Sequence, residues 1–358
     1  MTTFRKDGRY ADGRHPQRVT FAQTIEEDLS RRDFTMNAMA LTFDGQLIDP
    51  FGGQEDLDDR IIRAVGEASD RFQEDPLRMW RAVRFTGLGL VLSLGTEYAV
   101  QRYRHLLIHV SAERQRDELL KGLDSVHVER FLRAASRLGV LGVRWPEWEA
   151  AVGFDQHNPY HTKTVHEHLI DTASGGSTQL LRLTGLLHDI AKPSCFCWGL
   201  DDVGHFYGHE HVGAVYTRSM LERLAFDKKT IDAVCTLIDQ HMFPWDEAGK
   251  PAIRRMLREH GEETVQHLLE LRRMDVIGSG RRWETEESVR AKVQAVMEEV
   301  LVAKRTLAIS GNDVMRVAGI PPGPLVGQYL ARLQTWVDED PARNNQDLLV
   351  QQLHMWRD

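Results

Sequence analysis

Long apolar runs, an excess of positive charge and more than a few cysteines are all missing from this 358-residue sequence. No apolar run approaches the ~18 residues that a membrane-spanning helix needs, so we expect no membrane association. The N-terminal stretch MTTFRKDGRYADGRH has no apolar core and therefore does not resemble a secretory signal. The cysteines, Cys195, Cys197 and Cys235, are few and odd in number, which favours reduced thiols and a cytoplasmic location. A single C-x-C pair also argues against a structural zinc site.

The charge balance excludes a generic polyanion binder. Lys and Arg number 45 against 53 Asp and Glu, which gives a formal net charge of −8. A nucleic-acid partner would therefore need a local basic face. Two groups of arginines at helical spacing offer such a face, although each is equally consistent with a solvated helix surface: Arg78, Arg81 and Arg84, and Arg130, Arg133 and Arg137.

Strand signals are scarce and lie near the N-terminus. Val19–Phe21 and Leu41–Phe43 have strand character, and Asp44-Gly45 predicts a turn into Leu47-Ile48. From about residue 56 onward, Ile61 and Ile62 included, the apolar residues recur at helical period. The sequence thus predicts a mainly α fold with a small N-terminal β remnant.

Helix and boundary signals divide the chain further. Asp75 is predicted as an N-cap followed by Pro76 at the first helical position, and Ser111 as the cap of a later helix. A long amphipathic helix is predicted from about Glu284 to Arg305, and Ser310 is predicted as a further cap. Glycines and Trp145-Pro146 break the periodicity near 140–155. We predict four domains, at 1–65, 66–150, 151–280 and 281–358, in line with the two to four domains that this length favours.

Three motifs near the N-terminus carry groups suited to binding a nucleotide. They are RRDFTMNAMA (Arg31–Ala40), IDPFGGQEDL (Ile48–Leu57) and EDPLRMWRAVRF (Glu74–Phe85). Choosing a base without a template needs an acceptor for its exocyclic amine and a donor for its ring acceptors. Asp75 and Arg78, at i and i+3, can present both from one helix face. Each such pair can equally be a structural salt bridge.

In order and spacing these motifs resemble the class II nucleotidyltransferases, the bacterial CCA-adding enzymes and poly(A) polymerases. The resemblance implies CTP and ATP as substrates and the 3′ end of tRNA or another RNA as partner. It implies contacts to triphosphate and ribose for Arg32, Asp33 and Asn37, and reading of C or A by Asp75 and Arg78. Arg81 joins them as a nucleotide-binding candidate.

The same resemblance implies roles for two further segments. Phe51-Gly52-Gly53 leaves a loop where the backbone can approach closely, and the family uses this region as a hinge or spring. Glu113, Arg114 and Arg116 match a motif that braces the neck.

The acids that hold the catalytic metals of this family are expected upstream, in a Gly-Gly-x-Val-Arg-Asp stretch, in Asp-x-Asp, and just before a Thr-Thr-Phe-Arg stretch. This sequence opens Met1-Thr2-Thr3-Phe4-Arg5. Asp56-Leu57-Asp58 imitates the pattern but precedes a helix, so we reject it. Because nucleotidyl transfer needs clustered carboxylates for two metals, we expect no catalytic residue for it in this chain. The gene or sequence is truncated, a separate polypeptide supplies the acids, or the activity is lost.

A second set of motifs is rich in histidine. His188-Asp189 lies inside the apolar segment LLRLTGLLHDIAKP, where burying an imidazole and a carboxylate is costly without a metal or partner. With its neighbours it resembles the HD-domain superfamily of metal-dependent phosphohydrolases. The resemblance implies a core set of ligands and a second-metal set: His168, His188, Asp189 and Asp275, and His209 and His241.

Details of this centre stay open at the level of sequence. His166 is an alternative register for His168, and Lys192 matches a position able to contact phosphate. The metal is a divalent ion, of Mg or Mn type or another that imidazole and carboxylate accept.

These resemblances give the four predicted domains their identities: a partial nucleotidyltransferase head, a helical neck that binds RNA, a helical HD domain and a helical tail. Three functions follow. The chain belongs to a CCA-adding or poly(A)-adding enzyme, is a metal-dependent phosphohydrolase acting on nucleotide or RNA phosphates, or is the RNA-binding subunit of a split enzyme. The motifs do not separate CCA addition from poly(A) addition.

Overall fold

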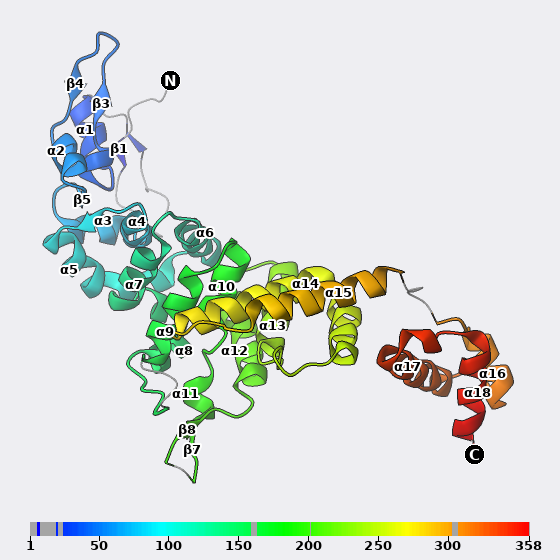
Figure 1. Cartoon of the computed structure of the whole chain (residues 1–358). Coiled ribbons are helices and arrows are strands. Elements are labelled where there is room, and N and C mark those ends of the chain that lie inside the picture. Colours follow the sequence, from blue (N-terminus) through cyan, green and yellow to red (C-terminus); the bar gives the residue numbers. More distant parts are fainter. Residues whose placement is uncertain are drawn as a thin grey trace. The chain divides into compact units, whose positions relative to one another are not determined.

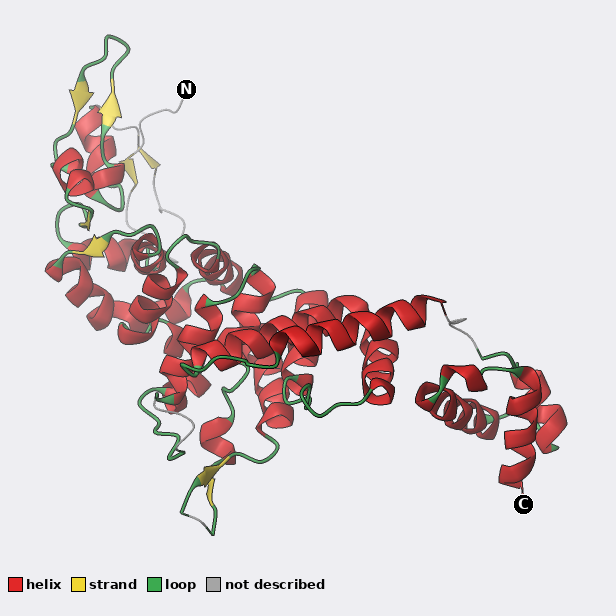
Figure 2. Ribbon diagram, viewed as in Figure 1, coloured by secondary structure: helices red, strands yellow, loops and turns green. Residues whose placement is uncertain are grey.

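The computed structural model describes residues 6–7, 19–20, 24–158, 163–200, 202–302 and 307–357 (Figure 1). This part of the chain consists mainly of α-helices, with short strands between them (Figure 2). The mainly α fold predicted from the sequence is therefore confirmed. Within the same residues, every helix is too short or too polar to cross a lipid bilayer.

The chain divides into two compact units. Unit 1 comprises Met1–His241 and Met274–Arg281, and unit 2 comprises Met242–Arg273 and Arg282–Asp358. Both sides of the break in periodicity near 140–155 contribute to one hydrophobic core of unit 1, which contains Phe131 as well as Leu169. The four-domain division of the sequence stays a prediction.

The N-terminal part of unit 1 contains the predicted hairpin. β3 (Ala40–Leu41) pairs antiparallel with β4 (Leu47–Ile48), and Gly45 takes a positive φ in the turn between them. β3 ends earlier than predicted because the Thr42 hydroxyl accepts a hydrogen bond from the Gln46 amide at 2.9 Å and closes the turn. β2 (Val19–Thr20) pairs with β1 (Lys6–Asp7), whereas Phe21 lies outside the described residues. Three short helices accompany the hairpin: α1 (Ile25–Ser30), η1 (Thr35–Asn37) and α2 (Gly53–Asp58).

Two strand pairs were not predicted. β5 (Ile61–Ile62) pairs parallel with β6 (Val91–Leu92), so the helix assigned to Ile61 and Ile62 is wrong. β7 (Cys197–Trp198) pairs antiparallel with β8 (Gly204–His205). Strands of two residues are too short to show the alternation that marks a strand in sequence.

The middle of unit 1 is a series of helices that pack around one core. They are α3 (Ala68–Glu74), α4 (Leu77–Thr86), α5 (Leu94–Tyr103), η2 (Arg104–His109), α6 (Ala112–Leu123), α7 (Val128–Arg137), η3 (Leu141–Val143) and α8 (Pro146–Ala151).

The predicted starts of α4 and α6 need correction. The cap of α4 is Pro76 rather than Asp75, which closes α3, although the Asp75 carboxylate still accepts from the Leu77 amide at 3.2 Å. Ser111 does cap α6, but without a hydrogen bond from its side chain.

The histidine-rich helices complete unit 1. They are α9 (Val165–Ser174), α10 (Gln179–Leu187), α11 (Lys192–Cys195), α12 (His209–Arg223), α13 (Lys228–Gln240) and the last turn of α14 (Lys250–Gly278). α9 begins with a capping box between Thr164 and Glu167, which fixes the register of the histidines that follow.

Unit 2 holds the rest of α14, which is interrupted at Gly261, and α15 (Glu286–Val302). α15 matches the predicted long helix, whose last residues lie outside the described part. Ser310 caps α16 (Gly311–Ala318) as predicted. α16 packs with α17 (Pro324–Glu339) and α18 (Gln346–Arg357) around a small core that includes Val314, Leu333 and Leu349, and η4 (Pro341–Arg343) joins the last two helices.

Candidate functional sites: a nucleotide pocket and a metal centre

A cavity of about 470 Å³ in unit 1 gathers the predicted nucleotide-binding residues. Its lining contains all six of them and one aromatic residue: Arg32, Asp33, Asn37, Asp75, Arg78, Arg81 and Phe85. The first three lie between α1 and the end of η1, Asp75 lies between α3 and α4, and the remaining three belong to α4. Segments separated by some forty residues in sequence thus meet at one polar cavity.

Asp33 organises the side of the cavity formed by η1. Its carboxylate accepts from the Asn37 amide at 3.1 Å and from Arg81 Nε at 2.7 Å. Arg32 donates to the backbone carbonyl of Asn37 at 3.1 Å. These contacts fix an acid and an amide, both able to bond hydroxyl groups, beside a guanidinium.

Asp75 and Arg78 are each held by a different neighbour. Arg114 of α6 donates to Asp75 at 3.1 Å. Arg78 donates to Glu74 at 3.0 Å and to the backbone carbonyl of Arg31 at 2.8 Å. Arg114, from the motif to which the family resemblance assigns a bracing role, therefore contacts Asp75 directly, whereas the role itself stays a prediction.

Phe85 is the cavity residue that the sequence analysis missed. Its ring meets Phe34 edge-on at 5.7 Å and lies under the Arg84 guanidinium at 4.3 Å. A signal was present, because Arg78, Arg81 and Phe85 stand at i, i+3 and i+7 on one helix face.

Asp56 of the rejected Asp56-Leu57-Asp58 pattern has a structural environment. Its buried carboxylate accepts from Arg63 Nε and Nη2, each at 3.0 Å, and from the Thr35 hydroxyl at 2.7 Å. These bonds tie Asp56 of α2 to Thr35 of η1 and to Arg63, which follows β5.

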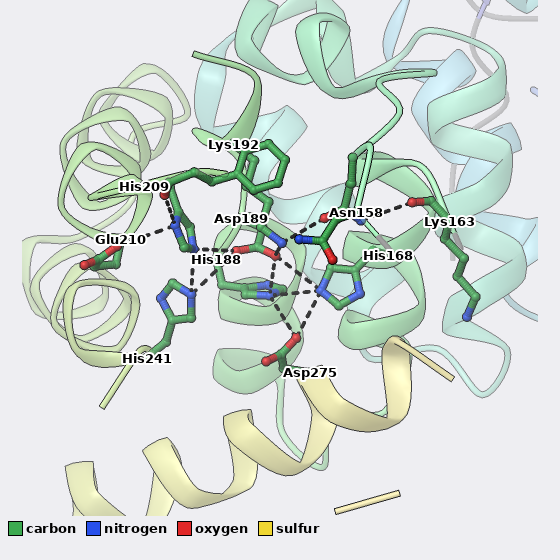
Figure 3. Close-up of polar contacts among 12 residues, drawn as sticks. Asn158, Lys163, His168, His188, Asp189, Lys192, His209, Glu210, His241 and Asp275 are labelled. Carbon is green, nitrogen blue, oxygen red and sulfur yellow. Dashed lines mark hydrogen bonds and ion pairs between the residues drawn. The ribbon is translucent and has the colours of Figure 1, made fainter. Parts of the chain in front are cut away.

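The predicted metal ligands converge at a second place in unit 1 (Figure 3). One group consists of His168, His188, Asp189 and Asp275, and the other of Asp189, His209 and His241. They come from α9, the end of α10, α14, the start of α12 and the end of α13. Asp189 belongs to both groups, as Figure 3 shows.

The spacing of these atoms fits divalent ions. Two ligands that each lie about 2.1 Å from one ion, at tetrahedral to octahedral angles, are roughly 3.0–3.4 Å apart. Asp189 Oδ2 is 3.3 Å from Nε2 of both His168 and His188, and Asp275 Oδ1 is 3.2 Å from His168 Nε2. Asp189 Oδ1 is 3.1 Å from His209 Nε2 and 3.5 Å from His241 Nε2.

The orientation of the imidazoles also fits ligation. Nδ1 of His188 is 2.9 Å from the Gly185 carbonyl, Nδ1 of His209 is 2.7 Å from that of Phe206, and Nδ1 of His241 is 2.6 Å from that of Ile238. A ring that donates through Nδ1 to a carbonyl keeps the lone pair of Nε2 for a metal. The backbone therefore sets the tautomer that a metal site requires.

Electrostatics of the buried cluster favour a cation. Burial opposes the ionised carboxylate, yet His188 and Lys192 hold the pKa of Asp189 well below its ordinary value. Burial alone would lower the pKa of His188, but Asp189 and Asp275 outweigh it and raise that pKa to about 10. Without a metal the carboxylates thus attract a proton onto His188, which a divalent ion would displace.

The structure also distinguishes the two possible registers of α9. His168 is fully buried in the cluster, whereas His166 Nδ1 accepts from the Gly153 amide at 3.0 Å and lines a different cavity. Lys192 Nζ lies 2.7 Å from Asp189 Oδ2 and donates to Gln156 at 2.9 Å. The lysine therefore connects the cluster to Gln156, and its predicted contact with phosphate stays a prediction.

Family comparisons match three segments of the chain. Residues 1–63 match the poly A polymerase head domain, residues 89–152 the probable RNA and SrmB-binding site of polymerase A, and residues 211–353 the putative tRNA nucleotidyltransferase domain 2.

Individual relatives match over most of the chain. The A-adding tRNA nucleotidyltransferase of Deinococcus radiodurans is 35% identical over 337 residues, covering 88% of this chain and 76% of that protein. The CCA-adding enzyme of Geobacillus sp. (strain WCH70) is 30% identical over 363 residues, covering 99% and 78%. The structure of the Bacillus stearothermophilus CCA-adding enzyme in complex with CTP is similar with a TM-score of 0.68 and 27% identity, over 99% of this chain and 78% of that one. The chain therefore belongs to the class II nucleotidyltransferase family, together with these tRNA nucleotidyltransferases.

Proposed function

We propose that this chain selects the nucleotide that is added to the 3′ end of a tRNA. The observation that carries the proposal is the meeting of all six predicted residues at one cavity. The names of the relatives, which are CCA-adding and A-adding enzymes, support tRNA as the partner. The match of residues 89–152 to an RNA-binding segment supports α5–α8 as the part that holds it.

The cavity can distinguish bases by the polarity of their edges. Cytosine and adenine each expose an exocyclic amine beside a ring nitrogen acceptor. Asp75 accepts from the amine and Arg78 donates to the ring nitrogen. Uracil and guanine place a carbonyl where the amine would be, and that oxygen is repelled by the Asp75 carboxylate. Arg32 suits the triphosphate, and Asp33 with Asn37 suits the ribose hydroxyls.

The residues at this cavity bind and orient the nucleotide. Metal ions held by clustered carboxylates supply the transfer chemistry in such reactions. Within the described residues, both groups with metal-ligating geometry belong to the histidine cluster. Incorporation of labelled CMP or AMP into a tRNA that lacks its 3′ end measures whether the purified chain also adds the nucleotide that it selects.

Calorimetric titration with CTP, ATP, GTP and UTP tests selection. We expect wild type to prefer CTP, ATP or both, and Arg78→Ala to weaken that binding by about tenfold. Asp75→Asn keeps the shape but adds an amide donor, so it is expected to narrow the gap between CTP and UTP. Arg102→Ala, an exposed arginine outside the cavity, serves as control. Equal affinity of wild type for all four nucleotides would disprove the proposal.

A second function is favoured by the geometry of the histidine cluster. We propose that it is the centre of a metal-dependent phosphohydrolase acting on nucleotide or RNA phosphates. A divalent ion there supplies Lewis-acid activation of a phosphate ester and of the attacking water. His168, His188, Asp189 and Asp275 would hold one ion, and Lys192 is placed to orient the phosphate.

Asp189→Ala tests this second function. We expect the purified chain to hydrolyse 3′-AMP in the presence of Mn²⁺ or Mg²⁺ and the variant to lose at least about a hundredfold in rate, because both ligand groups lose their shared oxygen atoms. Asp239→Ala is the matched control, since Asp239 pairs with His211 at 2.7 Å, outside the cluster. Equal rates in wild type and Asp189→Ala would remove the hypothesis.

A further inference from the structure

An aromatic hairpin lies beside the metal centre and has no role in the functions proposed so far. β7 and β8 form this hairpin next to α11 (Figure 1). Trp198 of β7 exposes 59% of its surface, and Tyr207, just after β8, exposes 75%. An exposed aromatic ring held at a fixed position offers a face on which the ring of a ligand can stack.

Trp198 is fixed by other rings rather than buried. Its ring lies 4.9 Å from that of His157 and meets Phe196 edge-on at 5.2 Å. Phe196 in turn contacts Phe154 at 5.6 Å and Phe206 at 5.8 Å. The Trp198 ring is therefore supported from within the protein while more than half of its surface faces solvent.

The hairpin is pressed against the segment that borders the metal centre. The Gly204 amide donates to the His157 carbonyl at 2.8 Å, and Asn158 donates to the Gly204 carbonyl at 3.2 Å. A Cβ at Gly204 would lie 2.4 Å from the Gln156 carbonyl oxygen, so only glycine allows this approach. Figure 3 places Asn158 beside Lys192 and the cluster.

Two contacts link the aromatic group to the cluster itself. Lys192 Nζ lies 5.4 Å from the centre of the Phe206 ring and 2.7 Å from Asp189. The Phe206 carbonyl is the 2.7 Å partner of Nδ1 of the ligand His209. Lys192 therefore lies between the Phe206 ring and Asp189 of the metal centre.

The two faces of the hairpin differ. Cys197 stands directly opposite His205 and Trp198 opposite Gly204, so Trp198 points to one face and His205 to the other. Tyr207 stacks on His205 with an interplanar angle of 6° and thus belongs to the second face. The face of Trp198 is the one in contact with His157, beside Gln156 and Asn158.

We propose that Trp198, supported by His157, stacks the base of an unpaired nucleotide whose phosphate enters the metal centre. The ligand is a nucleoside phosphate, either free or at the end of a single-stranded RNA, rather than a phosphate ester without a base. Stacking on an aromatic ring suits any base, because every base has a π-face, and Lys192 suits the phosphate. The inference rests on the proposed phosphohydrolase and names its class of substrate.

Binding tests the inference without any turnover. A short RNA that carries a 3′-phosphate and a 5′ fluorophore is titrated with the full chain, and the same titration is made with 3′-AMP by tryptophan quenching. Trp198→Ala is expected to weaken binding by about fivefold or more, and Trp198→Phe by less than about twofold. The difference in fluorescence quenching between wild type and Trp198→Phe gives the part of the signal that comes from Trp198 itself.

Three controls separate stacking from its alternatives. Tyr207→Ala removes an aromatic ring from the other face, and Leu200→Ala removes an exposed apolar side chain from the same hairpin. Thermal unfolding checks that each variant is folded. Unchanged affinity in Trp198→Ala, or equal losses in Trp198→Ala and Tyr207→Ala, would overturn the inference. Losses with the RNA alone would assign the site to strand ends, and losses with 3′-AMP as well would include free nucleotides.

Hydrolysis distinguishes failure of this inference from failure of the proposed function. With 3′-AMP as substrate, Trp198→Ala is expected to raise KM, whereas kcat/KM for ribose 5-phosphate, which has no base, stays unchanged. If wild type hydrolyses neither compound, the phosphohydrolase is wrong while the binding result still decides on stacking. If Trp198→Ala lowers kcat/KM equally for both substrates, stacking of a base is wrong.

Discussion

Asp189 is the residue on which the geometry of the candidate metal centre depends. Its oxygen atoms lie within 3.1–3.5 Å of Nε2 of four histidines, and its pKa stays well below the ordinary value despite full burial. A buried carboxylate is stable in the interior only when positive charge on its neighbours, or on an ion that they bind, balances its own negative charge. The adjacent His188 and Asp189 therefore balance one another's charge as well as offering ligand atoms.

The two histidines of α9 give a matched test of the ligand register. His168→Ala is expected to reduce bound Mn²⁺ measured after dialysis, because Nε2 of His168 lies within 3.3 Å of Asp189 and His188. His166→Ala is expected to keep the metal content of wild type, since its ring contacts Gly153 instead. A loss of metal in His166→Ala with retention in His168→Ala would reverse the assignment.

At the scale of elements, the glycine pair before α2 shows how a loop positions a binding residue. Gly52 has φ of 69° at the cap, and a Cβ on Gly53 would lie 2.1 Å from the carbonyl oxygen of Thr35. Thr35 begins η1, which carries Asn37 into the candidate nucleotide pocket. The close backbone approach expected at Phe51-Gly52-Gly53 is thus present, whereas the hinge role implied by the family stays a prediction.

Gly53→Ala is expected to lower the free energy of unfolding by about 1–3 kcal/mol, because backbone atoms of Thr35 must move to accept the methyl group. The same shift is expected to weaken CTP binding. Urea unfolding and calorimetry measure the two effects. Gly95→Ala in α5 is the control: its Cβ meets no atom within 4 Å, so it is expected to stabilise by up to about 0.5–1 kcal/mol. Similar behaviour of both variants would show that the contact of Gly53 is unimportant.

At the scale of the whole molecule, the Glu299 carboxylate makes the stability of the chain depend on pH. Glu299 of α15 accepts from Lys250 at 2.6 Å and from Arg254 at 2.7 Å, both on α14. Hydrogen bonds from these cations hold the pKa of Glu299 below its ordinary value of 4.5. A lowered folded pKa adds stability that is fully present above the unfolded value and is lost as pH falls through the folded one.

Glu299→Gln should therefore destabilise the chain near neutral pH, by up to about 1 kcal/mol because solvent screens the pair. The difference from wild type should shrink as pH falls below about 4.5, where wild type also loses the charge. Urea unfolding at several pH values, followed by circular dichroism, measures this. Glu298→Gln is the control, since Glu298 accepts only from Gln294 among the described contacts. A difference for Glu299→Gln that does not depend on pH would contradict the assignment.

Much of both candidate sites follows from the sequence alone. The motifs, through the family resemblances that they carry, predicted every polar residue that lines the cavity and every member of the histidine cluster. Periodicity likewise predicted the mainly α fold, since burial of one helix face needs apolar residues at i, i+3 and i+4. The strands β5–β8 were missed, because pairs of two residues depend on distant partners rather than on their own pattern.

Other features were decided only by the tertiary structure. Sequence predicted His168 but left His166 as an alternative register, and it could not assign Arg114 to Asp75. Nor could it place Phe85 in the candidate pocket or Trp198 near the candidate metal centre. Each of these depends on which segments, distant in sequence, come within a few ångströms of one another in the fold. A displacement of a few ångströms is enough to break a hydrogen bond or a ring contact. The sequence by itself determined which chemical groups this protein has and their order, whereas packing decided which of them meet.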